Sequence, residues 1–443
     1  MKRVMTMGAM TVALLTMVSC SESETEILTN PGGNGDQVAL GVSPNLKVAA
    51  GAKAGTKAVV DGEAITYVTT NYPSADHAPG LGVLVTNSGA TGWYSPDGQG
   101  YTGHHVWYMG DNAGANWKSI LIKENTFAAT NEVPYYLTST VGRVYAYYPY
   151  NSTLGTSLTN ITQESDLVIP VEVLTSGTIV ATTNNAKKYW NTNTWSNVLA
   201  ANKVNLSLDT EKDYLYFEPG TAGRYVNNGR TAGETPVKPE DDADNTNATN
   251  PGYKINLSMH HALAMVSFRV YDGGSLSSNN VDLTKIQIKN SDGSTANPFK
   301  TGNGSMSLVD GSITGSLTAG SIERNITGYT LMRQIPAGGA ESNQTFIAAG
   351  TGTNAINGKT VSKTVSAIIY PISPAFGDDD IEVVITLKEG NNPAVDYPVI
   401  LPGNAWEANN NYIYTLSAGR NKLTVMDVSV EAWVDQEQDE IPL

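Results

Sequence analysis

Short runs of β-branched and aromatic residues recur along the chain, and Gly, Asn and Pro residues separate them. Runs of this length and composition predict β-strands, and the residues between them predict turns. Helical patterns are few. Successive strands without intervening helices predict an all-β fold of antiparallel sandwich type. The clearest predicted strands are residues 81–86, 119–124, 142–150, 285–290, 366–372 and 381–389.

A predicted strand early in the second half has a clear apolar face. Because side chains alternate along a strand, this face would carry Ala262, Ala264, Val266, Phe268 and Val270. His260 has the same phase, so we expect it on this face as a hydrogen-bonded sheet histidine rather than a metal ligand.

The last predicted strand changes the phase of its apolar residues. Leu423 and Val425 have one phase, whereas Met426, Val428 and Val430 have the other. A change by one residue predicts a β-bulge, or a strand that serves two partners in succession.

Changes in composition divide the chain into five parts. Residues 1–19 are expected to form a signal peptide, and residues 20–56 a polar, lipidated tether or propeptide. Residues 57–218 and 254–443 are expected to form an N-terminal and a C-terminal β-sandwich, the first opening with a weakly alternating strand. Residues 219–253, rich in Pro, Gly, Asn and acidic residues, form either an interdomain linker or one large loop.

The N-terminus has the pattern of a bacterial lipoprotein signal. Lys2 and Arg3 precede an apolar run, residues 4–18, that is too short to span a bilayer comfortably. Ser19 and Cys20 end this run as a lipobox does, and Cys20 is the single cysteine of the chain. We therefore predict acylation at Cys20, with several acyl chains giving a stable anchor. The alternative is an ordinary signal peptide beside an accidental cysteine.

Composition limits the kinds of partner. Charged residues make up 16% of the chain, and the formal net charge is −15. An acidic surface repels phosphate backbones, so no nucleic-acid partner is expected. With the one cysteine acylated no disulfide can form, and stability must come from packed cores.

No group of residues has the spacing of a metal or catalytic site, so we expect no metal, no cofactor and no enzyme activity. The pairs His104-His105 and His260-His261 would point to opposite faces of a strand and cannot easily share an ion. The acidic groups at 241–244 and 378–380 indicate a solvated loop and a turn, with weak calcium binding at 378–380 as an open alternative. No G-x-S-x-G elbow occurs, and residues 352–359 miss the spacing of a phosphate-binding loop.

Aromatic residues gather in one region of the first half and leave two interpretations open. Flat rings can stack on sugars, whereas aromatic residues in an antiparallel sheet more often form cross-strand pairs or core. A surface carbohydrate-binding lipoprotein is therefore the alternative function. The residues concerned are Trp93, Tyr94, Tyr101, Trp107, Tyr108 and Trp117.

Several motifs occur in the order and spacing of a known family. Together with the lipobox they resemble the fimbrillins, fimbrial lipoproteins of anaerobic gut and oral bacteria, over nearly the whole mature chain. The motifs are the entry Thr56-Lys57-Ala58, the segments VYAYYPY and HHALAMVSFRV, and the closing pattern Trp406, Asn409, Tyr412 and Tyr414 followed by VSVEAW.

The resemblance implies a fold and a mode of assembly. Fimbrillins have two transthyretin-like antiparallel β-sandwich domains in tandem, are exported as outer-membrane lipoproteins, and lose an N-terminal segment with its first strand to a trypsin-like protease. A strand of a neighbouring subunit then fills the groove and satisfies its backbone groups and apolar pockets without a cofactor. The expected partners are other pilin subunits, a maturation protease and the outer membrane, and the product is an extracellular fimbria that supports adhesion.

The resemblance also places a processing site in the tether. The family usually cuts after Arg, but no Arg occurs from position 4 to position 142, and the lysines of the tether could equally be solubilising charges. The cut is expected at Lys57 and Ala58 or, less favoured, at Lys53 or Lys47.

The donor strand implied by the resemblance lies within residues 428–443. Beyond Trp433 this segment is acidic and has few large apolar residues. A tip or accessory subunit needs only to accept a strand, so the stalk, tip and anchor positions all stay open. The candidate pocket-filling residues are Val428, Val430, Ala432, Val434, Ile441 and Leu443.

Overall fold

The computed structural model describes most of the β-rich part of the chain. The described residues are 38–46, 80–95, 105–110, 117–120, 134–151, 154, 158, 160–180, 188–191, 194–197, 205–208, 210–219, 223–229, 251–272, 276, 281–334, 346–348, 355–356, 359–360, 364–420 and 422–432. Outside them lie the predicted signal peptide, the predicted strand at 57–68, Cys20, Lys47, Lys53, Lys57, Ala58, Val434, Ile441 and Leu443.

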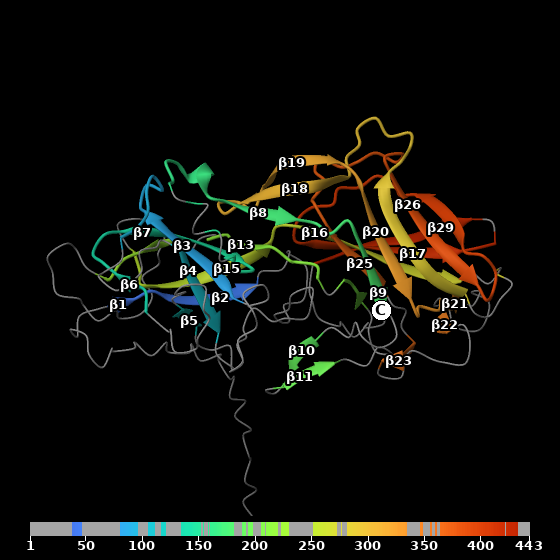
Figure 1. Cartoon of the computed structure of the whole chain (residues 1–443), viewed down its shortest axis with the longest axis horizontal. Helices are drawn as coiled ribbons and strands as arrows, with labels where there is room; N and C mark the ends of the chain where they lie inside the picture. The colour runs from blue at the N-terminus through green and yellow to red at the C-terminus, as the bar shows by residue number, and fades with distance from the viewer. Residues whose placement is uncertain are drawn as a thin grey trace, which may run out of the picture.

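An eight-stranded sheet gathers strands from the first 261 residues (Figure 1). It contains β2 (Gly41–Leu46), β3 (Leu81–Asn87), β4 (His105–Gly110), β5 (Trp117–Ile120), β7 (Gly142–Tyr148), β13 (Leu215–Phe217), β14 (Tyr225–Val226) and β15 (Lys254–His261). Its order is β2-β15-β13-β7-β3-β4-β5, and β14 pairs with β7. The two ends of this order, β2 and β5, contact each other, so the sheet curls.

Three further sheets contain most of the later strands. A seven-stranded sheet contains β12 (Asn205–Leu206), β16 (Ala264–Asp272), β21 (Met332–Gln334), β22 (Phe346–Ala348), β25 (Thr364–Ile369), β28 (Asn410–Ala418) and β29 (Leu423–Ala432). A five-stranded sheet contains β9 (Ser176–Val180), β17 (Val281–Asn290), β20 (Ser321–Thr327), β26 (Ile381–Glu389) and β27 (Val395–Ile400). A three-stranded sheet contains β8 (Val168–Glu172), β18 (Lys300–Ser307) and β19 (Ile313–Ala319).

The order of strands brings distant segments together. In the seven-stranded sheet the order is β12-β25-β16-β21-β22, and β28 lies between β16 and β29. The five-stranded sheet has the order β27-β26-β17-β20-β9, and the three-stranded sheet has the order β19-β18-β8. Two-stranded pairs and one short helix complete the described elements: β1 (Val38–Ala39) with β6 (Tyr136–Leu137), β10 (Lys188–Asn191) with β11 (Thr194–Asn197), β23 (Ala355–Ile356) with β24 (Lys359–Thr360), and the 3₁₀ helix η2 (Glu164–Asp166).

The predicted all-β class is confirmed. Most pairings are antiparallel, but five pairings of the described strands are parallel: β2 with β15, β9 with β20, β12 with β25, and β16 with both β21 and β28. Two parallel neighbours run in the same direction, so a long connection must carry the chain from the end of one strand back to the start of the other. A short hairpin can join only antiparallel strands.

Two hydrophobic cores stabilise these sheets. The smaller core lies against the eight-stranded sheet and includes Leu81, Val83, Phe217 and Leu257. The larger core is built mainly from strands after residue 261 and contains the fully buried Trp406. Burial of apolar area in these cores is the main stabilising term, because the described residues contain no disulfide.

Some strands join a sheet that lies mainly on the other side of the expected domain boundary. β15 opens the expected C-terminal part, yet it pairs with β13 and β2 of the eight-stranded sheet. β8 and β9 come from the expected N-terminal part, yet they pair with β18 and β20. Turn-rich composition marks where strands end but carries no information on which sheet they join.

The predicted alternation before Ala264 breaks at a corner. β15 ends at His261 and β16 begins at Ala264. His261 is therefore buried, whereas His260, which the sequence placed on the apolar face, is only partly buried. The prediction carried the phase of β16 through residues 262–263, where the chain leaves one sheet for another.

The predicted β-bulge in the last strand is confirmed. β28 pairs with β29, and the register shifts so that Thr415 lies opposite Asp427 while Leu416 lies opposite Val425. Met426 is the extra residue. The bulge allows Val425 and Val428 to pack against the same core, although they are three positions apart.

Candidate assembly site

Residues 38–46 lie at an edge of the eight-stranded sheet. β2 pairs in parallel with β15, from Gly41 opposite Lys254 to Leu46 opposite Met259. Just before it, β1 pairs antiparallel with β6. The segment therefore changes its ladder partner at Leu40.

Three hydrogen bonds hold the backbone at this change of partner. The Leu40 N–H donates to the carbonyl of Tyr135 at 2.8 Å, and the Gly41 N–H donates to the carbonyl of Tyr253 at 2.9 Å. From β4, the buried hydroxyl of Tyr108 donates to the Leu40 carbonyl at 2.9 Å. Leu40 and Gly41 are thus bonded on both sides of the segment.

Alternate side chains of the segment enter the core. Val38, Leu40 and Val42 are only 7%, 4% and 3% exposed, and the residues between them face outward. Our sequence analysis missed this strand inside the expected tether. The alternating apolar residues of "VALGV" are the signal that could have found it, but Gly, Asn and Pro around them suggested a loop.

Pro44 is compatible with this edge position. In a parallel ladder, alternate residues bond the same neighbour, and Gly41 bonds the β15 side. Pro44 comes three residues later, so its backbone nitrogen is on the side away from β15. Its missing N–H therefore removes no bond to β15.

The candidate cut sites all follow β2 in the chain. Lys47 comes directly after Leu46, and Lys53 and Lys57 come later. A cut at any of these lysines would separate β1 and β2, with every residue before them, from the remaining chain.

The candidate donor residues begin inside the chain's own sheet. Val428, Val430 and Ala432 lie in β29, opposite Tyr414, Tyr412 and Asn410 of β28. β29 pairs with no other strand among the described residues. Val428 packs against the larger core, whereas Val430 is 54% exposed.

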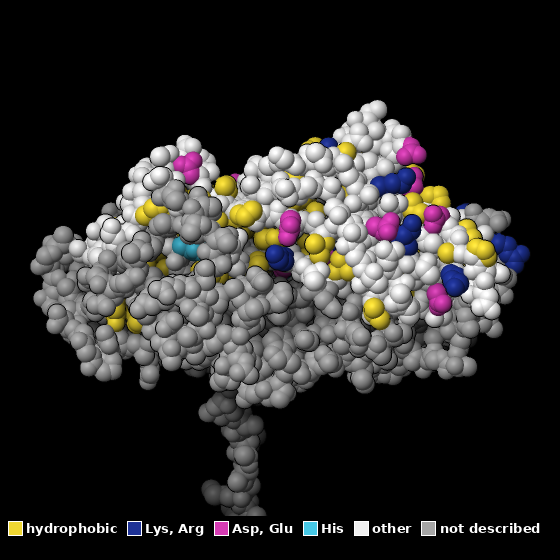
Figure 2. Space-filling model, in the orientation of Figure 1, with side chains coloured by type: hydrophobic (Ala, Val, Ile, Leu, Met, Phe, Trp, Pro, Cys, Tyr) yellow, Lys and Arg dark blue, Asp and Glu magenta, His cyan; other side chains and the backbone are white. Residues whose placement is uncertain are grey.

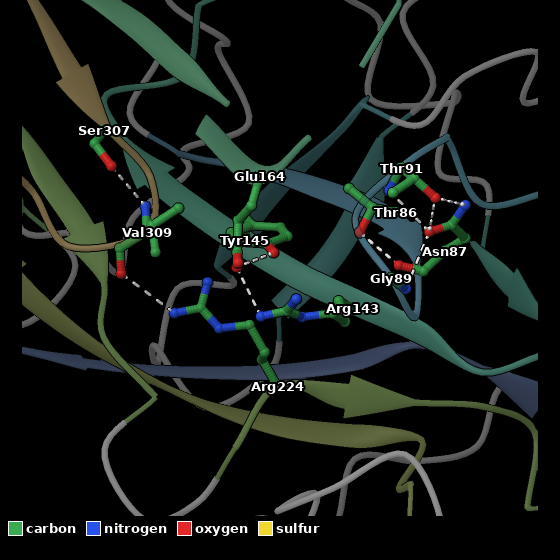
Figure 3. Close-up of polar contacts among 10 residues, drawn as sticks. All are labelled: Thr86, Asn87, Gly89, Thr91, Arg143, Tyr145, Glu164, Arg224, Ser307 and Val309. Carbon is green, nitrogen blue, oxygen red and sulfur yellow. Dashed lines mark hydrogen bonds and ion pairs between the residues drawn. The ribbon is translucent and has the colours of Figure 1, made fainter. Parts of the chain in front are cut away.

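A charged cluster beside β7 links the eight-stranded sheet to η2 (Figure 3). Glu164 Oε1 lies 2.6 Å from Arg143 Nη2 and accepts a 2.6 Å hydrogen bond from the Tyr145 hydroxyl. The Arg224 guanidinium lies 4.5 Å from the centre of the Tyr145 ring. Burial raises the pKa of Tyr145, and the bond to Glu164 raises it further. Desolvation lowers the pKa of Arg224.

The turn between β18 and β19 packs against the eight-stranded sheet next to this cluster. Arg224 Nη2 donates to the Val309 carbonyl at 3.5 Å (Figure 3). Gly311 has a φ of +71°, and a Cβ atom there would lie 2.2 Å from the ring of Tyr216 in β13. Only glycine fits this close approach. The contact joins the two parts of the chain away from the β15–β16 corner.

The closing motif around Trp406 connects the same two parts of the chain at the β15–β16 corner. The Trp406 indole N–H donates to the Tyr414 hydroxyl at 2.9 Å inside the core. Asn409 adopts a positive φ of 66°, and its N–H donates to the Leu263 carbonyl at 3.0 Å. Its side-chain oxygen accepts from the His261 N–H at 3.4 Å. These motif residues thus fix the start of β28 against the β15–β16 corner.

The aromatic region of the first half is largely core where it is described. Asn87 accepts hydrogen bonds from the N–H groups of Gly89 and Thr91, at 3.1 and 3.0 Å, and so turns the chain back after β3 (Figure 3). Tyr94 and Tyr108 are buried and do not present their rings to solvent. Tyr101 and the side chains of Trp107 and Trp117 lie outside the described part.

The acidic turn at 378–380 uses its carboxylates locally. Asp378 accepts from the Gly403 N–H at 2.8 Å. Asp380 accepts from the Ser294 hydroxyl at 2.6 Å and from the Gly377 N–H at 2.7 Å, and these bonds lower its pKa. Within the described ranges no group of three or more His, Cys, Asp and Glu residues could hold a metal ion.

The visible surface over the later strands has no field of one charge. Figure 2 shows basic and acidic side chains close together there. Lys289 Nζ lies 3.4 Å from Glu382 Oε1, and Lys285 Nζ lies 3.9 Å from Glu323 Oε2. Ion pairs near the surface contribute little stability. Among the described residues, no helix is long and apolar enough to cross a bilayer.

Comparisons with known proteins show what the chain is similar to. Solved structures that resemble the chain include a candidate cell adhesion protein from Bacteroides ovatus, with 13% identity and a TM-score of 0.43, covering 90% of this chain and 99% of that chain. The tip fimbrial protein Mfa3 from Porphyromonas gingivalis, truncated at its C-terminus, has 12% identity and a TM-score of 0.33, covering 82% and 97%.

The comparisons by sequence match a family model but no curated protein. The family model described as fimbrillin-like matches residues 242–433, a range that includes the β15–β16 corner, the Trp406 motif and β29. This part of the chain is therefore similar to the fimbrillin-like family.

Proposed function

We propose that this protein is a structural subunit of a cell-surface fimbria that polymerises by strand exchange and supports adhesion. The observation that carries the proposal is the place of residues 38–46. Their β2 part forms an edge strand of the eight-stranded sheet, Val38, Leu40 and Val42 are buried, and all of these residues precede every candidate cut site. The similarity of the later part of the chain to the fimbrillin-like family agrees with this role.

Loss of β1 and β2 would create an acceptor groove. The outer edge of β15 would lose its ladder partner, and the apolar pockets of Leu40 and Val42 would open to water. An extended segment of a neighbouring subunit can satisfy the backbone groups and the pockets together. Because donor and acceptor surfaces differ, the contact is head-to-tail and continues into a filament. The proposed donor lies within residues 428–443.

Processing would also release the subunit from its anchor. Cys20, the proposed lipidation site, precedes β1 in the chain, so the lipid and the first strand belong to one segment. A single cut, at Lys57 or at Lys53 or Lys47, would free the subunit from the outer membrane and open the groove at once. The stalk, tip and anchor positions all stay open. The role needs neither a cofactor nor catalysis.

Limited digestion of the full chain with a lysine-specific protease tests the proposal. The N-terminal sequence of the product identifies the cut, and unboiled gels and electron microscopy detect polymers. We expect ladders and filaments only after cleavage before residue 58.

A matched control carries Lys47→Gln, Lys53→Gln and Lys57→Gln, which should leave the chain uncut in the tether and monomeric. Cleaved protein that stays monomeric at high concentration would contradict the strand-exchange role.

A further inference from the structure

The outer strand of the three-stranded sheet lacks the usual protection of a sheet edge. This strand, β19, has the sequence ITGSLTA, with no charged residue and no proline. It pairs with β18 and with no other strand among the described residues (Figure 1). Proteins normally place charges or prolines at such an edge, because its free N–H and C=O groups otherwise pair with another chain.

Other edge strands of this protein do have that protection. β27, at the edge of the five-stranded sheet, carries Asp396 and Pro398. β8, at the opposite edge of the same three-stranded sheet, carries Pro170 and Glu172. The composition of β19 therefore leaves its edge open to pairing where these two edges are guarded.

Hydrogen bonds at the two ends of the β18–β19 ladder show which backbone groups point to the free edge. The Ser307 N–H donates to the Ser312 carbonyl at 2.9 Å, and the Gly320 N–H donates to the Phe299 carbonyl at 3.4 Å. Bonding alternates along an antiparallel ladder, so the even-numbered positions of β19 bond β18. The odd-numbered positions from 313 to 319 direct their N–H and C=O groups to the free edge.

The side chains of β19 leave this edge accessible. Ile313 and Leu317 are half-buried and pack against the larger core. Thr314, Ser316 and Thr318 are exposed on the other face. A strand that joins the edge would therefore meet small hydroxyl side chains on the solvent face.

Two copies of β19 match each other in one antiparallel register, centred on Ser316. Ile313 then lies opposite Ala319 of the second copy and Gly315 opposite its Leu317, and each pair exchanges two backbone bonds. All of these residues are odd-numbered positions that face the free edge. Gly315 has a φ of +114°, but the β18–β19 ladder keeps one register on both sides of it.

The solvent-face side chains also match in this register. Ser316 lies opposite its counterpart and Thr314 lies opposite Thr318, and hydroxyl pairs of this kind stabilise neighbouring strands. No charged side chain of β19 meets its own copy. This favours a second copy as the occupant, because the formal net charge of −15 makes two copies repel each other elsewhere.

We propose that β19 is a lateral contact at which a second copy of this chain pairs antiparallel, with Ser316 opposite its counterpart. One pair of seven-residue strands buries less area than the roughly 1,200–2,000 Å² of a stable interface, so isolated copies associate weakly. Copies held close together in large numbers associate firmly, because linked contacts reinforce one another. The contact does not depend on strand exchange, since β19 pairs with neither β2 nor β29.

Single cysteines in the full chain test this pairing. Each variant carries Cys20→Ser, so that the introduced cysteine is the only one. The cysteine of Ser316→Cys would face its counterpart at a non-hydrogen-bonded position, where opposed Cα atoms lie about 4.5 Å apart. With diamide as oxidant, we expect about tenfold more disulfide-linked dimer on non-reducing gels than for Thr314→Cys or Thr318→Cys alone.

Mixing the two control variants tests the register itself. Thr314→Cys mixed with Thr318→Cys should form as much dimer as Ser316→Cys, because these two positions lie opposite each other across the contact. Equal dimer from all three single variants, or no dimer from Ser316→Cys, would overturn the proposal.

An added charge gives a second measurement without disulfide chemistry. Ser316→Lys would place two ammonium groups opposite each other, so the dissociation constant for self-association in analytical ultracentrifugation should rise about fivefold. Gly293→Lys is the matched control, because it adds the same charge at a position where nothing lies within 4 Å of a Cβ atom. Equal effects of the two variants would overturn the role of β19.

Discussion

Leu40 shows how single residues hold the first strand in place. It lies between the β1–β6 ladder and the β2–β15 ladder, and the Tyr108 hydroxyl donates to its carbonyl where a ladder partner would otherwise do so. Its side chain is buried among apolar residues of the smaller core. Backbone and side chain are therefore fixed by different neighbours, and loss of either contact should loosen the strand.

Tyr108→Phe should loosen β2 without changing the shape of the core. The substitution keeps the ring and removes the hydrogen bond to the Leu40 carbonyl, which costs about 1 kcal/mol. We expect the Gly41 amide to exchange with solvent about fivefold faster, measured by hydrogen exchange of the full chain.

Tyr94→Phe is the matched control for this measurement. The Tyr94 hydroxyl bonds to Thr138 and Thr140 rather than to β2, although its ring belongs to the same core. Its loss should leave Gly41 exchange unchanged. Equal effects of both variants at Gly41 would show that the Tyr108 bond does not hold the strand.

At the scale of elements, buried polar contacts fix the register of β25, β16 and β28. The Ser267 hydroxyl in β16 lies 2.6 Å from the Ser366 hydroxyl in β25 and donates to Asn411 Oδ1 in β28 at 2.8 Å. All three residues are buried, so any slip of one strand would leave polar groups without partners. β28 held in this way is the support on which β29 pairs.

A double-mutant cycle on the two serines measures this constraint. Ser267→Ala should destabilise the protein by about 1–3 kcal/mol, because it leaves the buried Asn411 oxygen and the Ser366 hydroxyl without that contact. Ser366→Ala should cost less, since Ser267 keeps its bond to Asn411. The double variant should cost less than the sum of the two, in urea unfolding. Strict additivity would mean that the two hydroxyl groups do not interact.

At the scale of the whole molecule, two of the described contacts between the eight-stranded sheet and the later sheets depend on single residues. One is the β15–β16 corner with Asn409, and the other is the β18–β19 turn on Tyr216 and Arg224. The second connection depends on a glycine for a steric reason.

Gly311→Ala should break the second connection. The new methyl group would collide with the Tyr216 ring, and the positive φ disfavours any residue with a Cβ atom. We expect a loss of at least about 2 kcal/mol in the free energy of unfolding and a less cooperative thermal transition.

Gly293→Ala is the control for this substitution, since nothing lies within 4 Å of a Cβ atom at that position. It should leave the transition unchanged. A cooperative transition at an unchanged temperature in Gly311→Ala would contradict the role of this contact.

The sequence by itself determined the local features of this protein. Alternation and turn residues were enough to locate β3, β7 and β26, because side-chain period and backbone propensity act over a few residues. The shift of phase near Met426 was enough to predict the bulge. The order of the motifs along the chain was enough to indicate a resemblance to the fimbrillins, and a fimbrillin-like family model matches residues 242–433.

Only the tertiary structure decided which distant segments meet. It places residues 41–46 against β15, His261 beside Asp213 at 2.7 Å, and Glu211 in a buried ion pair with Arg324. These pairings depend on how loops of many residues close, and neither period nor propensity contains that information. The alternating apolar residues of the edge strand are present in the sequence, but the strand itself, its partner and the groove that the proposed function needs became evident only from the fold.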